Sequence, residues 1–255
     1  WTRWPRFTWE GGLGVGSLRV IEAISEAGRK RLEYNSAVYS VRKKGERVIV
    51  SYFRNGEARA IEAKAVVMAT PKFITHRIVE GLTEPQRKAM AAMRYAPFMT
   101  FNLCFSRVVY NQSYENFVVG ATHYTDFVPA DYVTEGKGGD LARPQVITVY
   151  APQPESDRHV FLSDEQTLAK ARAAVDELGA LFPGWGDHLK EVRVYRRGHA
   201  MPMSTPGFYT KLQPAARKDF GRVFFAHSDS NCDVSDFAYA GINGFEAVDK
   251  ALKVI

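Results

Sequence analysis

The chain has 255 residues, of which 45% are hydrophobic and 24% charged, a balance typical of a globular protein that can bury a core. No uninterrupted apolar stretch approaches the roughly 20 residues of a membrane helix. The net charge of +6 comes from Lys and Arg scattered in short groups with acidic neighbours, which form no phosphate-binding stripe. We therefore expect neither a membrane span nor a nucleic-acid partner.

The N-terminal part of the chain combines one amphipathic helix with a run of strands. Leu18 and Ile21 lie on one apolar face of a helix that Gly28 ends. The dipeptide Asn55-Gly56 predicts a hairpin turn between two strands. The expected elements are a helix over 16–30, strands over 37–41, 48–53 and 58–62, a continuous apolar strand over 65–71 and a helix over 71–79.

The rest of the chain interleaves helices and strands around an irregular, aromatic region at 110–165. Because both kinds of element alternate throughout, the predicted fold class is α/β or α+β with a mixed sheet. The expected elements are helices over 84–93, 164–182 and 236–253, and strands over 98–105, 146–150, 191–195 and 222–226.

The glycines at positions 12, 14 and 16 invite interpretation as a nucleotide-binding loop. Such a loop follows a buried strand, and an acidic residue ends a second strand about 20 residues later. Residues 6–10 are too few and too polar to form the first of these strands. We interpret 12–16 as a loop that precedes the first helix, with direct phosphate contact as the alternative.

The acidic loop at 229–233 is similar to the start of a calcium-binding loop. Val234 and Ala240 occupy the positions where such a loop needs Gly and a bidentate Glu. His227 and Cys232 lack a second ligand pair with zinc spacing. We therefore predict no metal site. The two cysteines lie far apart and are expected to be free thiols, which leaves the compartment open between cytoplasm and periplasm.

Four short motifs occur in order along nearly the whole chain. They are Trp-Glu-Gly-Gly at 9–12, Asn-Ser-Ala-Val-Tyr-Ser-Val at 35–41, Val-Val-Met-Ala-Thr-Pro at 66–71 and Phe-Phe-Ala-His-Ser-Asp at 224–229. In this order the chain resembles the flavin-containing amine oxidases and their relatives, which include phytoene desaturases, protoporphyrinogen oxidases and polyamine dehydrogenases. The last motif is most similar to the polyamine-dehydrogenase-like members.

The resemblance implies FAD as the cofactor and a two-part architecture. Residues 1–80 and 200–255 would be parts of an FAD-binding domain of the NAD(P)-binding Rossmann-like kind, and 81–199 an inserted substrate-binding domain. The family's N-terminal GxGxxG unit has no match here, so a missing N-terminal segment of the same protein is an expected partner. Without that segment, the chain alone is expected to be inactive.

The resemblance also assigns cofactor-binding positions. Val38 would contact the adenine through its backbone, and Ser228 would meet the ribityl chain or the pyrophosphate. Phe237 and Ala238 would direct backbone N–H groups at the N1/O2 edge of the flavin, where a helix N-terminus stabilises the negative charge of the reduced form. The further cofactor-binding positions are Ala69, Thr70, Asp229 and Gly241.

Two positions depart from the family pattern. His227 replaces a glycine beside the cofactor. Thr100 stands where many amine oxidases carry a Lys that holds a water at flavin N5, which favours a dehydrogenase or desaturase over fast reaction with oxygen. Thr100 and His199, the polar residue ranked first for substrate contact, are the candidate catalytic positions.

The implied reaction is hydride transfer from a C–H bond next to an amine nitrogen to flavin N5. Tyr95, Phe98 and Tyr150 offer aromatic surface for a small-molecule substrate, either a neutral amine or an apolar compound. A carotenoid- or phytoene-desaturase-like flavoenzyme and a non-catalytic flavoprotein-like binding module are the alternatives. The sequence does not indicate an oligomeric state.

Overall fold

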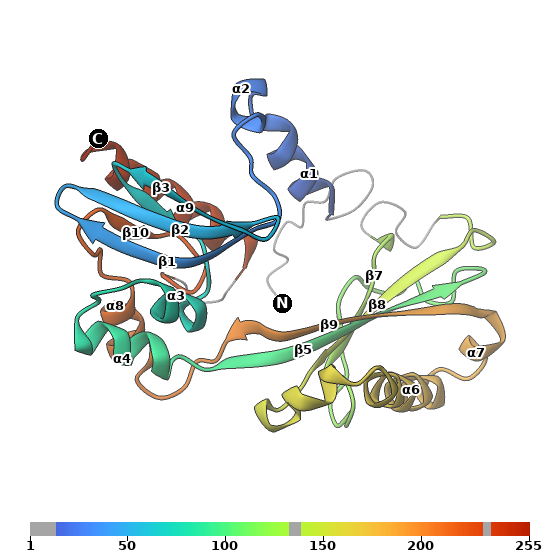
Figure 1. Ribbon diagram of the computed structural model, residues 1–255. Coiled ribbons are helices and arrows are strands. Elements are labelled where there is room, and N and C mark those ends of the chain that lie inside the picture. The colour runs from blue at the N-terminus through green and yellow to red at the C-terminus, as the bar shows by residue number, and fades with distance from the viewer. Residues whose placement is uncertain (1–13, 133–138, 232–235) are drawn as a thin grey trace. The chain divides into compact units, whose positions relative to one another are not determined.

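The computed structural model describes residues 14–132, 139–231 and 236–255 (Figure 1). The motif at 9–12, the start of the glycine loop and the 232–233 part of the acidic loop lie outside these residues. The chain divides into two compact units: Trp1–Arg31 with Ala96–Ala200, and Leu32–Tyr95 with Met201–Ile255. We call them the first and the second unit and describe each by itself.

The first unit is built on a five-stranded sheet with the strand order β6-β7-β8-β5-β9. Alternate residues of β5 point to opposite faces, so that Phe101 and Leu103 are buried while Phe98 and Thr100 are half-buried. Helix α6 packs on the buried face, as Figure 1 shows for α6 and β5. The bounds are β5 (Tyr95–Phe105), β6 (Asn116–Phe117), β7 (Asp126–Pro129), β8 (Gln145–Pro152), η2 (Glu155–Leu162), α6 (Asp164–Leu181), α7 (Trp185–His188) and β9 (Leu189–Pro202).

The helix predicted over 16–30 is two helices, α1 (Gly14–Ala23) and α2 (Glu26–Arg29). The break lies at Ser25, whose hydroxyl accepts a hydrogen bond of 3.1 Å from the backbone N–H of Gly28 and caps α2. The prediction missed this break because the apolar periodicity continues through the capping serine.

The second unit contains an antiparallel meander and a parallel pair of strands. The meander has the order β1-β2-β3, and the predicted Asn55-Gly56 turn is confirmed, with φ of 53° and 83° at the two residues. In the parallel pair, Val66 of β4 lies opposite Val223 of β10 and Met68 lies opposite Phe225. The bounds are β1 (Ser36–Lys44), β2 (Arg47–Arg54), β3 (Glu57–Ala63), β4 (Val66–Met68) and β10 (Val223–Phe225).

Helices surround these strands in the second unit. Helix α4 packs against α3 and α8, and its Met90 lies with Met93 and Tyr95 in a core that also contains Val41 and Phe225. This packing places residues 81–95 in the second unit, whereas the sequence placed the division at 80, and 14–31 fall in the first unit. The bounds are α3 (Lys72–Ile78), α4 (Glu84–Ala92), η3 (Phe208–Leu212), α8 (Gln213–Ala216) and α9 (Phe237–Leu252).

The predicted class of mixed helices and strands is confirmed, with parallel and antiparallel pairs distributed over separate sheets. The region at 110–165 holds more regular structure than expected, namely β6, β7 and η2 in addition to the strand at β8. Among the residues that the structure describes, none of the helices has the length and apolar character needed to cross a membrane.

Candidate functional site

The carboxyl ends of β4 and β10 form one edge of the parallel pair. Because the strands are parallel and in register, the segments that leave them start side by side: Thr70 and Pro71 after β4, and 226–231 after β10. Crevices outside the carboxyl ends of parallel strands are the usual ligand positions in α/β proteins. Four of the predicted cofactor residues follow these strands, and three more lie in the N-terminal part of α9.

A fully buried ion pair joins the two segments. The Lys72 Nζ atom lies 2.6 Å from Asp229 Oδ1, and both side chains have 0% exposure. The same ammonium group donates to Ser230 Oγ at 2.7 Å and lies 5.5 Å from the centre of the Phe225 ring. The ammonium therefore exchanges its hydration for a carboxylate, a hydroxyl and an aromatic face.

The second oxygen of Asp229 is also engaged. Oδ2 accepts from the backbone N–H of Lys72 at 2.9 Å and from the Tyr95 hydroxyl at 2.5 Å. Burial, the charge of Asp229 and the hydrogen bond to it raise the pKa of the Tyr95 hydroxyl well above its ordinary value. Burial alone would raise the pKa of the Asp229 carboxyl, but Lys72 and then His227 hold it below its usual range.

His227 contacts Asp229 in two mutually exclusive ways. Its Nδ1 atom lies 3.2 Å from the backbone nitrogen and 3.1 Å from Oδ2 of Asp229. An unprotonated Nδ1 accepts from the backbone N–H, whereas a protonated Nδ1 donates to the carboxylate. His227 thus belongs to the hydrogen-bonded group around Asp229.

The other predicted positions on these segments are more accessible than Asp229. Ala69 is exposed, and Thr70 and Ser228 are half-buried. The Thr70 hydroxyl lies 2.9 Å from that of Thr75 in the first turn of α3. Val38 lies on β1 next to a register shift that leaves Tyr39 without a partner on β2, a bulge of the kind that redirects strand residues.

Helix α9 begins with its N-terminal residues exposed. The Asp236 side chain accepts from the backbone N–H of Tyr239 at 2.9 Å and so caps the helix. Phe237 and Ala238 are exposed, and the first N–H groups of a helix have no intrahelical acceptor. A Cβ at Gly241 would meet no described atom within 4 Å, so packing among the described residues does not require that glycine.

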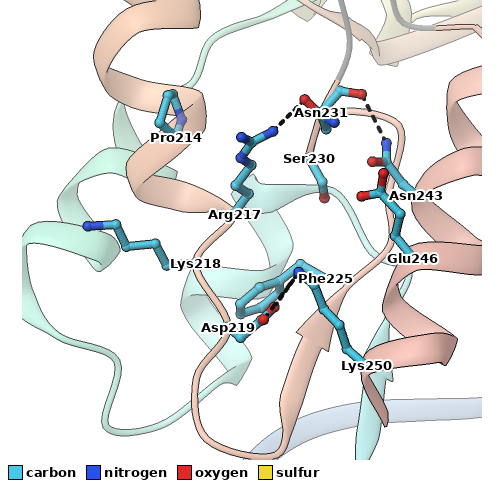
Figure 2. Close-up of a pocket in the computed structure, with 10 residues that line it drawn as sticks. All are labelled: Pro214, Arg217, Lys218, Asp219, Phe225, Ser230, Asn231, Asn243, Glu246 and Lys250. Atoms are coloured by element: carbon cyan, nitrogen blue, oxygen red, sulfur yellow. Dashed lines mark hydrogen bonds and ion pairs between the residues drawn. The ribbon is translucent and has the colours of Figure 1, made fainter. Parts of the chain in front are cut away.

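Figure 2 shows the residues that line a polar cavity of about 630 Å³ in the second unit. Two of them, Ser230 and Phe225, also contact the Lys72 ammonium of the buried ion pair. Ser230 lines the cavity from the loop after β10, and Asn243 lines it from α9. The buried Asn243 amide donates to the His227 carbonyl at 3.2 Å and to that of Asn231, whose own side chain accepts from Arg217. Sequence reasoning missed this cavity because its walls come from distant segments with no shared motif.

Thr100 lies on the half-buried face of β5 in the first unit. It pairs with Tyr150 of β8, whose ring makes an edge-to-face contact with Phe98 at 6.0 Å. Next to them, the Thr148 hydroxyl donates to Asn102 at 2.9 Å. Burial, then the nearby Tyr114 and acidic residues, raises the pKa of Tyr150. This face therefore combines aromatic rings with neutral polar groups and with the half-buried Asp126 carboxylate, which lies opposite Tyr150 on β7.

His199 lies on β9, where it lines a groove of about 650 Å³ beside η2. Phe161 and Leu162 form an apolar wall of this groove, and His159 also lines it. Thr100, on β5, is not one of the residues that line this groove. Tyr95, expected to offer aromatic surface to a substrate, is instead buried against Asp229.

Within the described ranges, no group of three or more His, Cys, Asp or Glu side chains could hold a metal ion.

The sequence model of the family described as flavin containing amine oxidoreductase matches residues 1–234. The chain belongs to this family. Among curated proteins, oxidoreductase PigB from Serratia sp. (strain ATCC 39006) is 19% identical over an alignment of 255 positions, which covers 95% of this chain and 38% of that protein.

Solved structures of amine oxidases share the fold of this chain. Cyclohexylamine oxidase from Brevibacterium oxydans IH-35A aligns with a TM-score of 0.70 at 16% identity, covering 96% of this chain and 53% of that one. A redesigned putrescine oxidase aligns with a TM-score of 0.69 at 16% identity, covering 95% and 53%. The chain thus spans about half the length of these structures and less of PigB.

Proposed function

We propose that this chain is part of an FAD-dependent oxidoreductase that removes a hydride from a C–H bond next to an amine nitrogen. The observation that carries the proposal is the carboxyl edge of β4 and β10 beside the exposed N-terminus of α9, in a chain of this family. Membership of the family implies a flavin, and FAD is the form we propose.

Residues at this edge, on β1 and at the start of α9 fit a dinucleotide in their chemistry. Ser228 offers a hydroxyl, Val38 offers backbone groups at a bulge, and Phe237 with Ala238 offers N–H donors at the positive end of a sixteen-residue helix. A bound flavin would supply the hydride acceptor for this reaction, at N5. The protein supplies position, exclusion of water and a positive potential for the charge that develops.

For the substrate we propose a neutral amine or an apolar small molecule. Support comes from the face of β5 and β8, where Phe98 and Tyr150 lie beside the neutral Thr100. A threonine at position 100 cannot hold a water by charge as a lysine does. We therefore propose an electron acceptor other than oxygen.

The test is an absorbance spectrum of the full-length protein, followed by anaerobic addition of amines, polyamines and carotenoids. Flavin bands that bleach with an amine support the proposal. Bleaching with a carotenoid alone would favour a desaturase, for which the aromatic face of the sheet is equally suited. A folded, colourless protein that does not take up FAD would contradict the proposal and favour a binding module.

A further inference from the structure

We propose that Asp229, Lys72 and Tyr95 form a buried lock that positions Ser228 for the cofactor, with Asp229 as a positioning residue. The proposal rests on the proposed function, because the group to be positioned is FAD. It changes the role of Asp229, which the family resemblance made a cofactor contact.

The contacts of Asp229 leave no room for a ligand. Oδ1 accepts from the Lys72 ammonium, and Oδ2 accepts from the Lys72 backbone and the Tyr95 hydroxyl. The side chain has 0% exposure, as has that of Lys72. A cofactor atom that reached the carboxylate would first have to displace one of these donors inside the protein.

The lock joins segments that are far apart in the chain. Lys72 begins α3 after β4, Tyr95 begins β5, and Asp229 follows β10. Strands β4 and β10 pair over only three residues, so their own hydrogen bonds constrain the following loops weakly. The lock supplies the missing constraint, because one carboxylate holds the start of α3 through both a main-chain and a side-chain donor.

The same loop is fastened on its other side to α9. The buried Asn243 amide donates to the carbonyls of His227 and Asn231, which lie on either side of Ser228 and Asp229. Ser228 is therefore held between the lock and α9, while its own side chain stays half-buried rather than buried. This arrangement fixes the hydroxyl relative to the helix N-terminus that is proposed to face the flavin.

Loss of one charge of the ion pair should disturb the position of the loop after β10 more than loss of both charges. Removal of the Asp229 charge leaves the ammonium of Lys72 buried without its counter-ion, and the loop must then rearrange. Removal of both charges leaves no ion to solvate, and the apolar surroundings such as Phe225 remain.

The experiment uses full-length protein and measures FAD affinity and the spectrum of bound FAD for seven variants. These are Asp229→Asn, Lys72→Met, their combination, Ser228→Ala, Ser228→Ala with Asp229→Asn, Tyr95→Phe, and Tyr95→Phe with Ser228→Ala. Asp219→Asn is the matched control, because Asp219 pairs with Lys250 in an exposed ion pair of the same unit. Each titration is run at a temperature where circular dichroism shows the apoprotein to be folded.

We expect Asp229→Asn to weaken FAD binding about tenfold, equivalent to about 1.4 kcal/mol, and to shift the flavin bands, with no change for Asp219→Asn. Adding Ser228→Ala to Asp229→Asn should weaken binding by less than about twofold further, because the hydroxyl is already misplaced. The variant that combines Lys72→Met with Asp229→Asn should bind FAD more tightly than either single variant. If Asp229→Asn does not fold, Tyr95→Phe and its combination with Ser228→Ala give the same comparison.

If the fold-losses in FAD affinity caused by Ser228→Ala and Asp229→Asn multiply in the double variant, the lock is overturned. An unchanged FAD affinity and spectrum in a folded Asp229→Asn variant would also overturn it. Failure of the wild-type full-length protein to bind FAD is a different outcome. It removes the proposed function and the positioning role together.

Discussion

The ammonium group of Lys72 lies 2.6 Å from the carboxylate of Asp229, although 157 residues separate them in the chain. The pair fastens the segment after β4 to the segment after β10. Four measurements follow from this contact and from the neighbouring helix α9.

Lys72 and Asp229 should contribute to the stability of the fold through their interaction with each other. Asp229→Asn or Lys72→Met alone should each lower the free energy of unfolding by about 3–5 kcal/mol, because one buried charge loses its partner. The combination should cost less than the sum of the two. Urea unfolding at neutral pH gives the interaction energy. Additive losses would show that the two groups are energetically independent despite their contact.

Acid should remove the contribution of Asp229. Its pKa is lower in the folded protein than in the unfolded chain, so its stabilising effect is present above the unfolded pKa of about 3.9 and is lost as the pH falls towards the folded pKa. The gap in unfolding free energy between wild type and Asp229→Asn should shrink by about 1.4 kcal/mol per pH unit below about pH 4. Urea titrations across this range measure it. A gap independent of pH would contradict the lowered pKa.

The N-terminus of α9 should act through its backbone. Phe237 is the first helical residue, so Phe237→Pro removes its N–H while the proline ring still suits that position. If this N–H stabilises reduced flavin, the midpoint potential should fall by roughly 30–65 mV, from about 1.5–3 kcal/mol for one bond to a charged group. Phe237→Ala keeps the N–H and is the control. Equal potentials in the two variants would show that α9 does not contact the flavin.

The 255-residue chain alone should bind FAD weakly. In the part that the structure describes, β4 is followed by Ala69-Thr70-Pro71 and β10 by Ala226-His227, so neither strand leads into a glycine-rich turn at a helix N-terminus. Such turns supply the main backbone donors to a pyrophosphate. Isothermal titration measures the affinity. A submicromolar dissociation constant would mean that other groups of this chain hold the phosphates.

Local chemistry accounts for what the sequence predicted well. The Asn55-Gly56 turn follows from two residues that tolerate positive φ, and α6 follows from an apolar period over eighteen residues that Ser163 caps. The strand predicted over 191–195 is shorter than the observed strand, Leu189–Pro202. The prediction stopped early because apolar alternation is weak on an edge strand, where polar residues such as Arg196 and Arg197 occur.

The candidate site was only partly predictable. The resemblance indicated the segments at 66–71 and 224–229, and the structure places them side by side. It did not indicate that Lys72 would pair with Asp229, because no periodicity or spacing relates two residues that meet only through the pairing of β4 with β10. One local signal could have indicated that Lys72 has a buried acidic partner. The lysine comes directly after an apolar strand, where a buried helix start is expected.

Because Lys72 is buried, the reactivity of its amine can report on the opening of the edge formed by the loops after β4 and β10. Lysines elsewhere in the second unit, such as Lys44 and Lys250, are largely exposed and should react quickly with acylating reagents. The Lys72 amine can react only while the loops after β4 and β10 are transiently apart. The rate at which mass spectrometry detects its acylation therefore measures how often this edge opens, and a ligand bound there should slow that rate.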